Sequence, residues 1–225
     1  RSCTDVLVQA VVRWMIAPAL RVVYRPRVEG RGNVPKRGPV ILAANHLSFI
    51  DSVVIPLVAP RPVAFLAKAE YFEHPLMRLC LNGTDAIPVR RTDVRAAQAS
   101  LETALEVLAA GRAFGIHPEG SRSRDGRLYR GRTGVAWLAL ESGAPVVPVA
   151  LSGTDRIQPV GKRLPRIGRI TVRFGQPLRF AGPNTNGARR EATDEIMAAI
   201  QRLSGQEPAG DYNELKVSST TRGEA

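Results

Sequence analysis

The chain has 225 residues, 44% of them hydrophobic, which is enough to bury one substantial core, and we expect a single domain around it. Its formal net charge of +12 at pH 7 favours anionic partners, namely phosphate esters, an anionic membrane surface or nucleic acid. Only two cysteines are present, Cys3 and Cys80, which excludes a disulfide framework and favours a reducing, cytosolic environment.

Nucleic-acid binding is the alternative from a different functional class, and the sequence gives it little support. Aromatic residues make up only 5% of the chain and are not interleaved with the basic clusters, as base-stacking platforms require. The sequence contains no zinc-finger spacing and no Gly-x-x-x-x-Gly-Lys-Ser/Thr loop. The positive charge is therefore expected to face phosphate esters or lipid, and we expect no nucleic-acid partner.

The first segment, residues 1–25, has an amphipathic helical pattern. Its polar residues recur at multiples of four: Gln9, Arg13, Arg21 and Arg25. A transmembrane span needs about 20 consecutive apolar residues, and the arginines and Pro18 inside this segment argue against one. We expect an interfacial helix that dips into an anionic membrane surface, anchored by Trp14 and the arginines; a helix packed on the core is the alternative.

From residue 39 onward, short apolar runs alternate with segments of helical period, which is typical of an α/β domain. The apolar runs predict strands at 39–44, 63–67, 86–89, 113–117, 145–151 and 170–175. The helical periods predict helices at 51–58, 74–81, 94–110, 133–142 and 187–203. The polar tail, residues 205–225, lacks apolar periodicity and is predicted to be disordered.

An imidazole and a carboxylate follow the first predicted strand, in the segment 45–51 (NHLSFID). Sites in α/β sheets are built at strand ends. A neutral imidazole accepts a proton near pH 7, and a carboxylate on its other nitrogen fixes the tautomer and stabilises the imidazolium. His46 and Asp51 are therefore candidates for a general base and its orienting group. A strand-end histidine beside an unrelated helix-capping aspartate is the alternative.

A second polar block, residues 117–124 (HPEGSRSR), follows another predicted strand. Together the two blocks resemble the glycerolipid acyltransferases of the 1-acylglycerol-3-phosphate acyltransferase type, which carry an Asn-His-x-x-x-x-Asp block followed later by a Pro-Glu-Gly-Thr-Arg-Ser block. Ser121 stands where that family has threonine, so the hydroxyl is preserved. Weaker blocks at 86–91 and 145–150 also fit, and the resemblance covers residues 25–180.

The resemblance implies a layered mixed sheet flanked by helices and an acyltransferase catalytic domain at residues 26–204. It implies an O-acyltransferase that moves a fatty acyl group from acyl-CoA or acyl carrier protein to the free hydroxyl of 1-acyl-glycerol-3-phosphate. The product would be phosphatidic acid, for phospholipid biosynthesis; another lipid or glycerol phosphate acceptor is the alternative. It implies no cofactor beyond this co-substrate, and a peripheral or monotopic location on the cytoplasmic face of the cell membrane.

By the same resemblance, His46 takes the proton of the acceptor's hydroxyl while Asp51 holds the ring, so that the alcohol attacks the thioester directly. Arg122 is predicted to bind the acceptor's phosphate, because a guanidinium binds two phosphate oxygens at once. Arg91 is the second phosphate candidate. Its neighbour Arg90, which stands where the family commonly has aspartate, is the alternative to Arg91.

Four further residues complete the predicted site. Glu119 is expected to orient the acceptor's hydroxyls or to position Arg122, and Gly120 to allow close backbone approach. Ser121 belongs to the same acceptor side by its place in the block. Pro148 is expected to shape the strand edge beside the acyl donor.

A metal site and a serine nucleophile are the alternative interpretations of these residues. A metal site would draw on a cluster of four residues: His46, Asp51, His117 and Glu119. The chain has only three histidines and no His-Glu-x-x-His pair, so we expect no metal, and His117 is expected to be structural. Ser48 is a conceivable nucleophile, but its position favours a turn hydroxyl.

Overall fold

The computed structural model describes residues 24–68, 73, 86–89, 94–159, 161 and 166–213. Nearly all of the predicted N-terminal helix lies outside these ranges, as do the helix predicted at 74–81, both Arg90 and Arg91, and the last residues of the chain from 214.

Every predicted strand is present, with each end within one residue of its predicted position. The described strands are β1 (Arg27–Glu29), β2 (Val40–Ala44), β3 (Val63–Lys68), β4 (Ile87–Val89), β5 (Ala113–Ile116), β6 (Val146–Ser152) and β7 (Thr171–Phe174). The described helices are η2 (Arg31–Asn33), α3 (Asp51–Val58), α5 (Val94–Ala109), α6 (Gly134–Ser142), α7 (Thr154–Ile157) and α8 (Asn186–Ser204). The sequence did not predict β1, η2 or α7.

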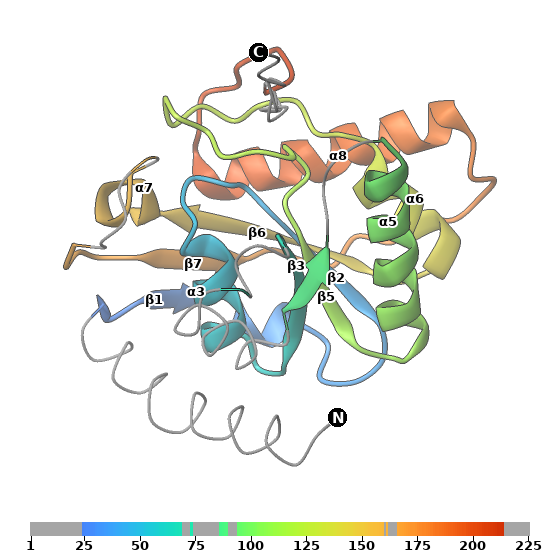
Figure 1. The fold of residues 1–225 in the computed structure, drawn as a ribbon, viewed down its shortest axis with the longest axis horizontal. Helices are drawn as coiled ribbons and strands as arrows, with labels where there is room; N and C mark the ends of the chain where they lie inside the picture. Colours follow the sequence, from blue (N-terminus) through green and yellow to red (C-terminus); the bar gives the residue numbers. More distant parts are fainter. Residues whose placement is uncertain are drawn as a thin grey trace, which may run out of the picture.

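The strands form one mixed sheet in the order β1-β7-β6-β2-β5-β3-β4, as Figure 1 shows. All neighbours run parallel except β6 and β7, which are antiparallel. The α/β fold with a layered mixed sheet is therefore confirmed. Strand β2 lies in the centre, where Ala43 pairs with Ile116 of β5 on one side and with Pro148 of β6 on the other.

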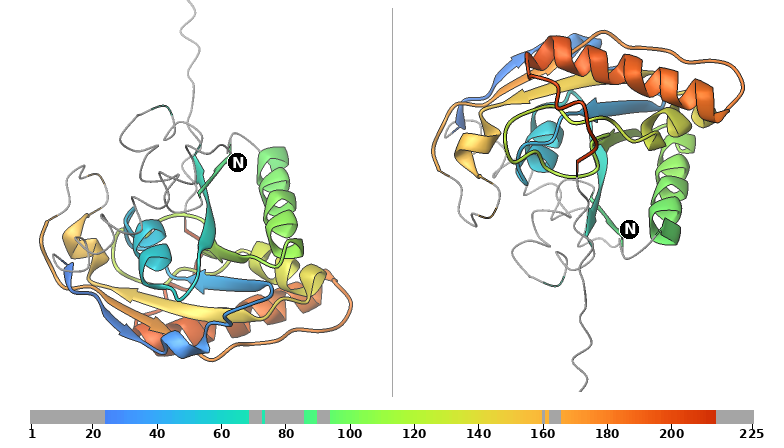
Figure 2. Two further views of the ribbon diagram at one scale, coloured as in Figure 1. Left: turned by 90° about the horizontal axis from the view of Figure 1, so that it is seen from below. Right: turned by 90° about the horizontal axis from the view of Figure 1, so that it is seen from above.

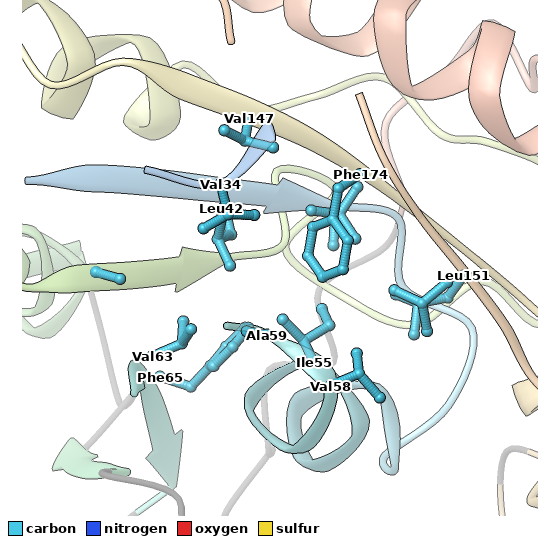
Figure 3. Packing of buried hydrophobic residues seen from close by; sticks show 14 of the residues in the cluster. Val34, Leu42, Ile55, Val58, Ala59, Val63, Phe65, Val147, Leu151 and Phe174 are labelled. Atoms are coloured by element: carbon cyan, nitrogen blue, oxygen red, sulfur yellow. The ribbon is translucent and has the colours of Figure 1, made fainter. Parts of the chain in front are cut away.

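Helices cover both faces of the central strands, and Figure 2 shows α3 and α8 on opposite sides. On the α3 face, Ile55 and Val58 pack on Leu42, Phe65 and neighbouring side chains, as drawn in Figure 3. The other face carries α5, α6 and α8, whose apolar residues pack on alternate residues of the same strands. Burial on both faces explains why β2 and β6 are continuous apolar runs in the sequence.

The parallel pairing of β2 and β5 brings two distant stretches of sequence together. Because both strands end at the same edge of the sheet, the segments that follow them, 45–51 and 117–124, lie side by side. A backbone hydrogen bond joins these segments, since the Ser123 N–H donates to the carbonyl oxygen of His46 at 2.7 Å. The fold thus assembles the two polar blocks into one site.

The beginning of the C-terminal tail is ordered, which corrects the predicted disorder for residues 205–213. The Leu128 N–H donates to the Glu207 carbonyl at 2.9 Å, and the Ala209 N–H donates to the Leu128 carbonyl at 2.8 Å. This pairing partner lies about 80 residues away in sequence, so local composition could not reveal it.

The tight packing of Gly115 in β5 leads to a stability prediction. A Cβ atom at this position would lie 2.0 Å from the Phe65 ring, whereas a Cβ at Gly187 in α8 would meet nothing within 4 Å. Gly115→Ala should therefore lower the free energy of unfolding by about 1 to 3 kcal/mol through overpacking. Gly187→Ala should leave it unchanged or raise it by up to about 1 kcal/mol. Urea denaturation measures both, and a Gly115→Ala protein as stable as the wild type would contradict the packing described here.

Candidate active site

The predicted histidine and aspartate meet at the carboxyl end of β2. His46 Nδ1 lies 3.0 Å from Asp51 Oδ2. The same carboxylate oxygen accepts the backbone N–H groups of Leu47 and Ser48, each at 2.7 Å. Asp51 is fully buried, and the side chain of His46 is 17% exposed. The carboxylate thus holds both the imidazole and the turn that carries it.

This geometry fixes the protonation pattern of the pair. Burial alone would raise the pKa of the Asp51 carboxyl, but the hydrogen bond from His46, the nearby imidazoles and the Ser48 amide together hold this pKa below its usual value. An ionised carboxylate only accepts hydrogen bonds, so His46 Nδ1 carries the proton and Nε2 keeps a lone pair. The ring is therefore arranged to accept a proton at Nε2.

Asp51 does not cap helix α3, although the sequence left that alternative open. It is the first residue of the helix, and its Oδ2 bonds to amides that precede the helix. Its position in the first helical turn also suits a negative charge, because the helix dipole is positive there.

Glu119 lies beneath the backbone of His46, and its predicted role toward the acceptor or Arg122 stays a prediction. It is fully buried; Oε1 accepts the His46 N–H at 2.8 Å and Oε2 accepts the Tyr129 N–H at 2.9 Å. Burial raises the pKa of Glu119 to about 7, although both amide hydrogen bonds act in the opposite direction. Glu119 therefore positions the backbone of His46 and is shielded from solvent.

The other residues of the second block form a turn beside His46. Gly120 has φ 77° and donates its N–H to the His117 carbonyl at 3.0 Å, a left-handed conformation that favours glycine. Ser121 is half-buried, and its carbonyl accepts from the Asn213 side chain at 3.4 Å. Arg122 is half-buried and makes no hydrogen bond or ion pair with any described residue. Its guanidinium is thus not committed to another part of the described chain.

Pro148 is not part of the assembled site. It lies buried in the middle of β6, and its neighbours Val147 and Val149 both belong to the cluster on the α3 face. Strand alternation places Pro148 on the opposite face, where Gly175 and Leu203 of α8 lie close to it. Pro148 is therefore a core residue in this structure, and its place beside the acyl donor stays a prediction.

Ser48 and His117, the residues of the two alternative interpretations, are both hydrogen-bonded within the protein. The Ser48 side chain is fully buried, and Oγ donates to the carbonyl of Gln158, far away in sequence after α7, at 2.7 Å. His117 has both ring nitrogens within hydrogen-bond distance of protein atoms. Among the residues that the structure describes, no three histidine, cysteine, aspartate or glutamate side chains are placed to hold a metal ion.

Two features that the sequence reasoning missed support the site from outside. Asn45, directly before His46, donates to the Leu151 carbonyl at 3.0 Å and accepts the Leu151 N–H at 2.8 Å, which ties the end of β2 to β6. An open cleft of about 350 Å³ borders Leu47 next to His46 and is lined by Arg156 and Arg169. Its lining residues come from five separate segments, so no single block of sequence could indicate it.

The buried Glu119 gives a pH-dependent prediction. The pKa of Glu119 is about 7 in the folded protein, against an ordinary value of 4.5. Between these two pH values the folded protein keeps a proton on Glu119 that the unfolded chain loses. The stability contributed by Glu119 should therefore fall from pH 4.5 to 7, by at most about 1.4 kcal/mol per pH unit. Glu119→Gln cannot titrate, so the stability advantage of the wild type over this variant should shrink across the window.

Urea denaturation at pH 5, 6 and 7 tests this, with Glu102→Gln on the exposed side of α5 as the control for loss of one charge. Glutamine has one acceptor oxygen where glutamate has two, so either the His46 or the Tyr129 N–H is left without a partner. This should lower the free energy of unfolding of Glu119→Gln by about 1 to 3 kcal/mol at every pH. A difference between wild type and Glu119→Gln that stays constant with pH would contradict the assignment.

Comparisons with known proteins show which family the chain resembles. A family model described as Acyltransferase matches residues 25–152. A chloroplastic 1-acyl-sn-glycerol-3-phosphate acyltransferase of Arabidopsis thaliana is 31% identical over 157 residues, which are 69% of this chain and 44% of that protein. The corresponding enzyme of Borreliella burgdorferi is 33% identical over 128 residues, 57% of this chain and 51% of that protein. The chain thus spans about half the length of these curated relatives.

A solved structure shares the fold. The 1-acyl-sn-glycerophosphate acyltransferase of Thermotoga maritima superposes with a TM-score of 0.69 at 24% identity, covering 89% of this chain and 87% of that one. The family model spans more than half of the 225 residues and includes His46, Asp51 and Glu119. On these grounds the chain belongs to the acyltransferase family.

Proposed function

We propose that this protein transfers a fatty acyl group from acyl-CoA or acyl carrier protein to the free hydroxyl of 1-acyl-glycerol-3-phosphate, giving phosphatidic acid. The observation that carries the proposal is the bond of 3.0 Å between His46 Nδ1 and the buried Asp51, which leaves Nε2 as a base. The acceptor named for several relatives, 1-acyl-sn-glycerol-3-phosphate, supports the choice of substrate.

In the proposed mechanism, His46 Nε2 takes the proton of the acceptor's hydroxyl as that oxygen attacks the thioester carbonyl. The new C–O bond forms, the C–S bond breaks, and the proton passes from His46 to the leaving thiolate. Asp51 stays ionised throughout and stabilises the imidazolium that forms between the two steps. No covalent acyl-enzyme is needed, and Ser48 is given no part because its buried hydroxyl donates to the Gln158 carbonyl.

The acceptor's phosphate is proposed to bind Arg122. The residue after Arg122, Ser123, donates its backbone N–H to the His46 carbonyl, and this bond holds the backbone next to Arg122 against that of His46. A guanidinium pairs with two phosphate oxygens and stays charged at all relevant pH values. Arg91, which lies outside the described residues, remains the second proposed phosphate ligand.

Membrane association is a further part of the proposal. No helix within the described ranges combines the length and the apolar character needed to cross a bilayer. From its sequence pattern, we propose that the amphipathic segment 1–25, nearly all of which lies outside the described residues, holds the protein peripherally or monotopically on the anionic cytoplasmic face of the membrane. The net charge of +12 supports this attraction.

The role of the histidine can be tested by substitution. His46→Ala should lower the turnover number by about 10² to 10⁴, the usual contribution of general-base catalysis, while the unfolding transition is preserved. Asp51→Asn should also be strongly impaired, because a neutral amide stabilises an imidazolium less well. Thiol release from palmitoyl-CoA in the presence of 1-acylglycerol-3-phosphate measures the rate. A folded His46→Ala protein that keeps more than about a tenth of wild-type turnover would rule out His46 as the base.

The role of Arg122 can be separated from general surface charge. Arg122→Ala should raise the KM for 1-acylglycerol-3-phosphate by about 10- to 150-fold, since a charge-assisted phosphate contact contributes about 1.5 to 3 kcal/mol. Arg124→Ala, an exposed arginine in the same loop, is the matched control and should change this KM little.

A phosphate-free acceptor sharpens the Arg122 test. Neither arginine variant should change the slow acylation of monoacylglycerol, because this acceptor has no phosphate whose contact could be lost. Equal losses for the phosphorylated acceptor and for palmitoyl-CoA would count against phosphate binding by Arg122.

A further inference from the structure

A second histidine lies directly against the ring of the proposed base. The rings of His46 and His117 are stacked, with centroids 3.9 Å apart and an angle of 8° between their planes. His117 also contacts Phe65, whose ring is tilted by 32° at a centroid distance of 5.5 Å. The proposed mechanism gives His117 no task, although no other ring lies as close to His46 within the described part of the chain.

Hydrogen bonds hold His117 in one form. Nδ1 lies 3.1 Å from the carbonyl oxygen of Ala44 and 3.1 Å from that of Asn45. Carbonyl oxygens only accept, so Nδ1 carries the proton, and Nε2 accepts from the Ser52 hydroxyl at 3.1 Å. His117 is therefore a single neutral tautomer with both nitrogens occupied.

The partners of His117 flank both members of the proposed catalytic pair. Ala44 and Asn45 directly precede His46, and Ser52 directly follows Asp51 at the start of α3. One ring thus bonds the chain on both sides of the turn and also covers one face of the imidazole that the turn presents. Gly115, two residues before His117, supports the arrangement, because its missing side chain leaves room for the Phe65 ring.

We propose that His117 is a positioning residue, whose flat neutral ring holds the His46 imidazole in the plane where Asp51 binds Nδ1 and the acceptor hydroxyl reaches Nε2. The task of His46 in this statement rests on the proposed function. The placement of its ring by His117 does not, and it can be measured without any substrate.

The electrostatics around His46 are consistent with this role. His46 faces the Asp51 carboxylate from α3, the buried Glu119 beneath its backbone, and His117 on its ring face. Burial, with the nearby His46 as the second cause, lowers the pKa of His117 to about 3. His117 thus stays neutral when His46 becomes an imidazolium, so the stacked ring adds no repulsion at a distance of 3.9 Å.

Two substitutions separate the ring from its hydrogen bonds. His117→Phe keeps a flat ring and loses the bonds to Ser52 and the two carbonyls, whereas His117→Gln keeps a donor and an acceptor and loses the ring. We expect His117→Phe to retain the turnover number within about threefold, and His117→Gln to lower it about tenfold or more, because misplaced catalytic groups are costly. The KM values for palmitoyl-CoA and 1-acylglycerol-3-phosphate should stay within about twofold in both, since no substrate contact is removed.

The opposite ranking, with the glutamine variant active and the phenylalanine variant impaired, would overturn the proposal, because the hydrogen bonds would then carry the effect. Turnover that falls in parallel with the urea midpoint in both variants would also overturn it, since His117 would then be merely structural. His117→Tyr serves as a second ring variant if His117→Phe does not unfold cooperatively.

An NMR measurement tests the placement without catalysis. In ¹⁵N-histidine-labelled, ligand-free protein, the His46 Nδ1–H proton bonded to Asp51 should give a protected downfield resonance in the wild type and in His117→Phe. It should be lost to solvent exchange in His117→Gln. A protected resonance in His117→Gln would refute the positioning role. Absence of phosphatidic acid formation by the wild type would refute only the proposed function, since the NMR result does not depend on it.

Discussion

The structure of the site depends on one buried carboxylate oxygen. Oδ2 of Asp51 accepts the imidazole Nδ1–H and the N–H groups of Leu47 and Ser48, so a single atom determines the turn and the orientation of His46. Three donors offset the cost of removing this charge from water. Glu119 holds the same segment from below, through the His46 N–H. The imidazole is thus fixed by its ring nitrogen, its backbone and its stacked face, which is the preorganisation that proton transfer requires.

The sheet could be predicted from the sequence because most of its strands are buried on both faces. Strands such as β2 and β6 are continuous apolar runs, and their ends lie within one residue of the predicted positions. The strand β1 escaped prediction because its three residues, Arg27–Glu29, are exposed or half-buried and carry no apolar signal. Helix α7 has only four residues, too few to show a helical period. The order of the strands, which creates the site, is a long-range property that no local pattern contains.

The sequence predicted those site residues whose chemistry follows from their residue type. It did not predict the role of residues whose role depends on how deeply the fold buries them. His46 and Asp51 are five residues apart, and their meeting follows from the local turn. Glu119 stands in a polar block and looks like a ligand in the sequence, yet the fold buries it completely. Pro148 fits a family-like block, but the face to which a strand residue points depends on its neighbours in the sheet. The stacking of His117 on His46 likewise requires β2 and β5 to be adjacent.

The most direct test of the account follows the acyl group when the acceptor is withheld. Purified protein mixed with palmitoyl-CoA alone, analysed by intact mass spectrometry and thiol release, should show no acylated protein and no burst of free thiol. Addition of 1-acylglycerol-3-phosphate should then release one thiol for each phosphatidic acid formed, because in the proposed mechanism His46 activates the acceptor's own hydroxyl for direct attack. A stable or transient mass increase of one palmitoyl group on the protein, with thiol release before the acceptor is added, would contradict this mechanism.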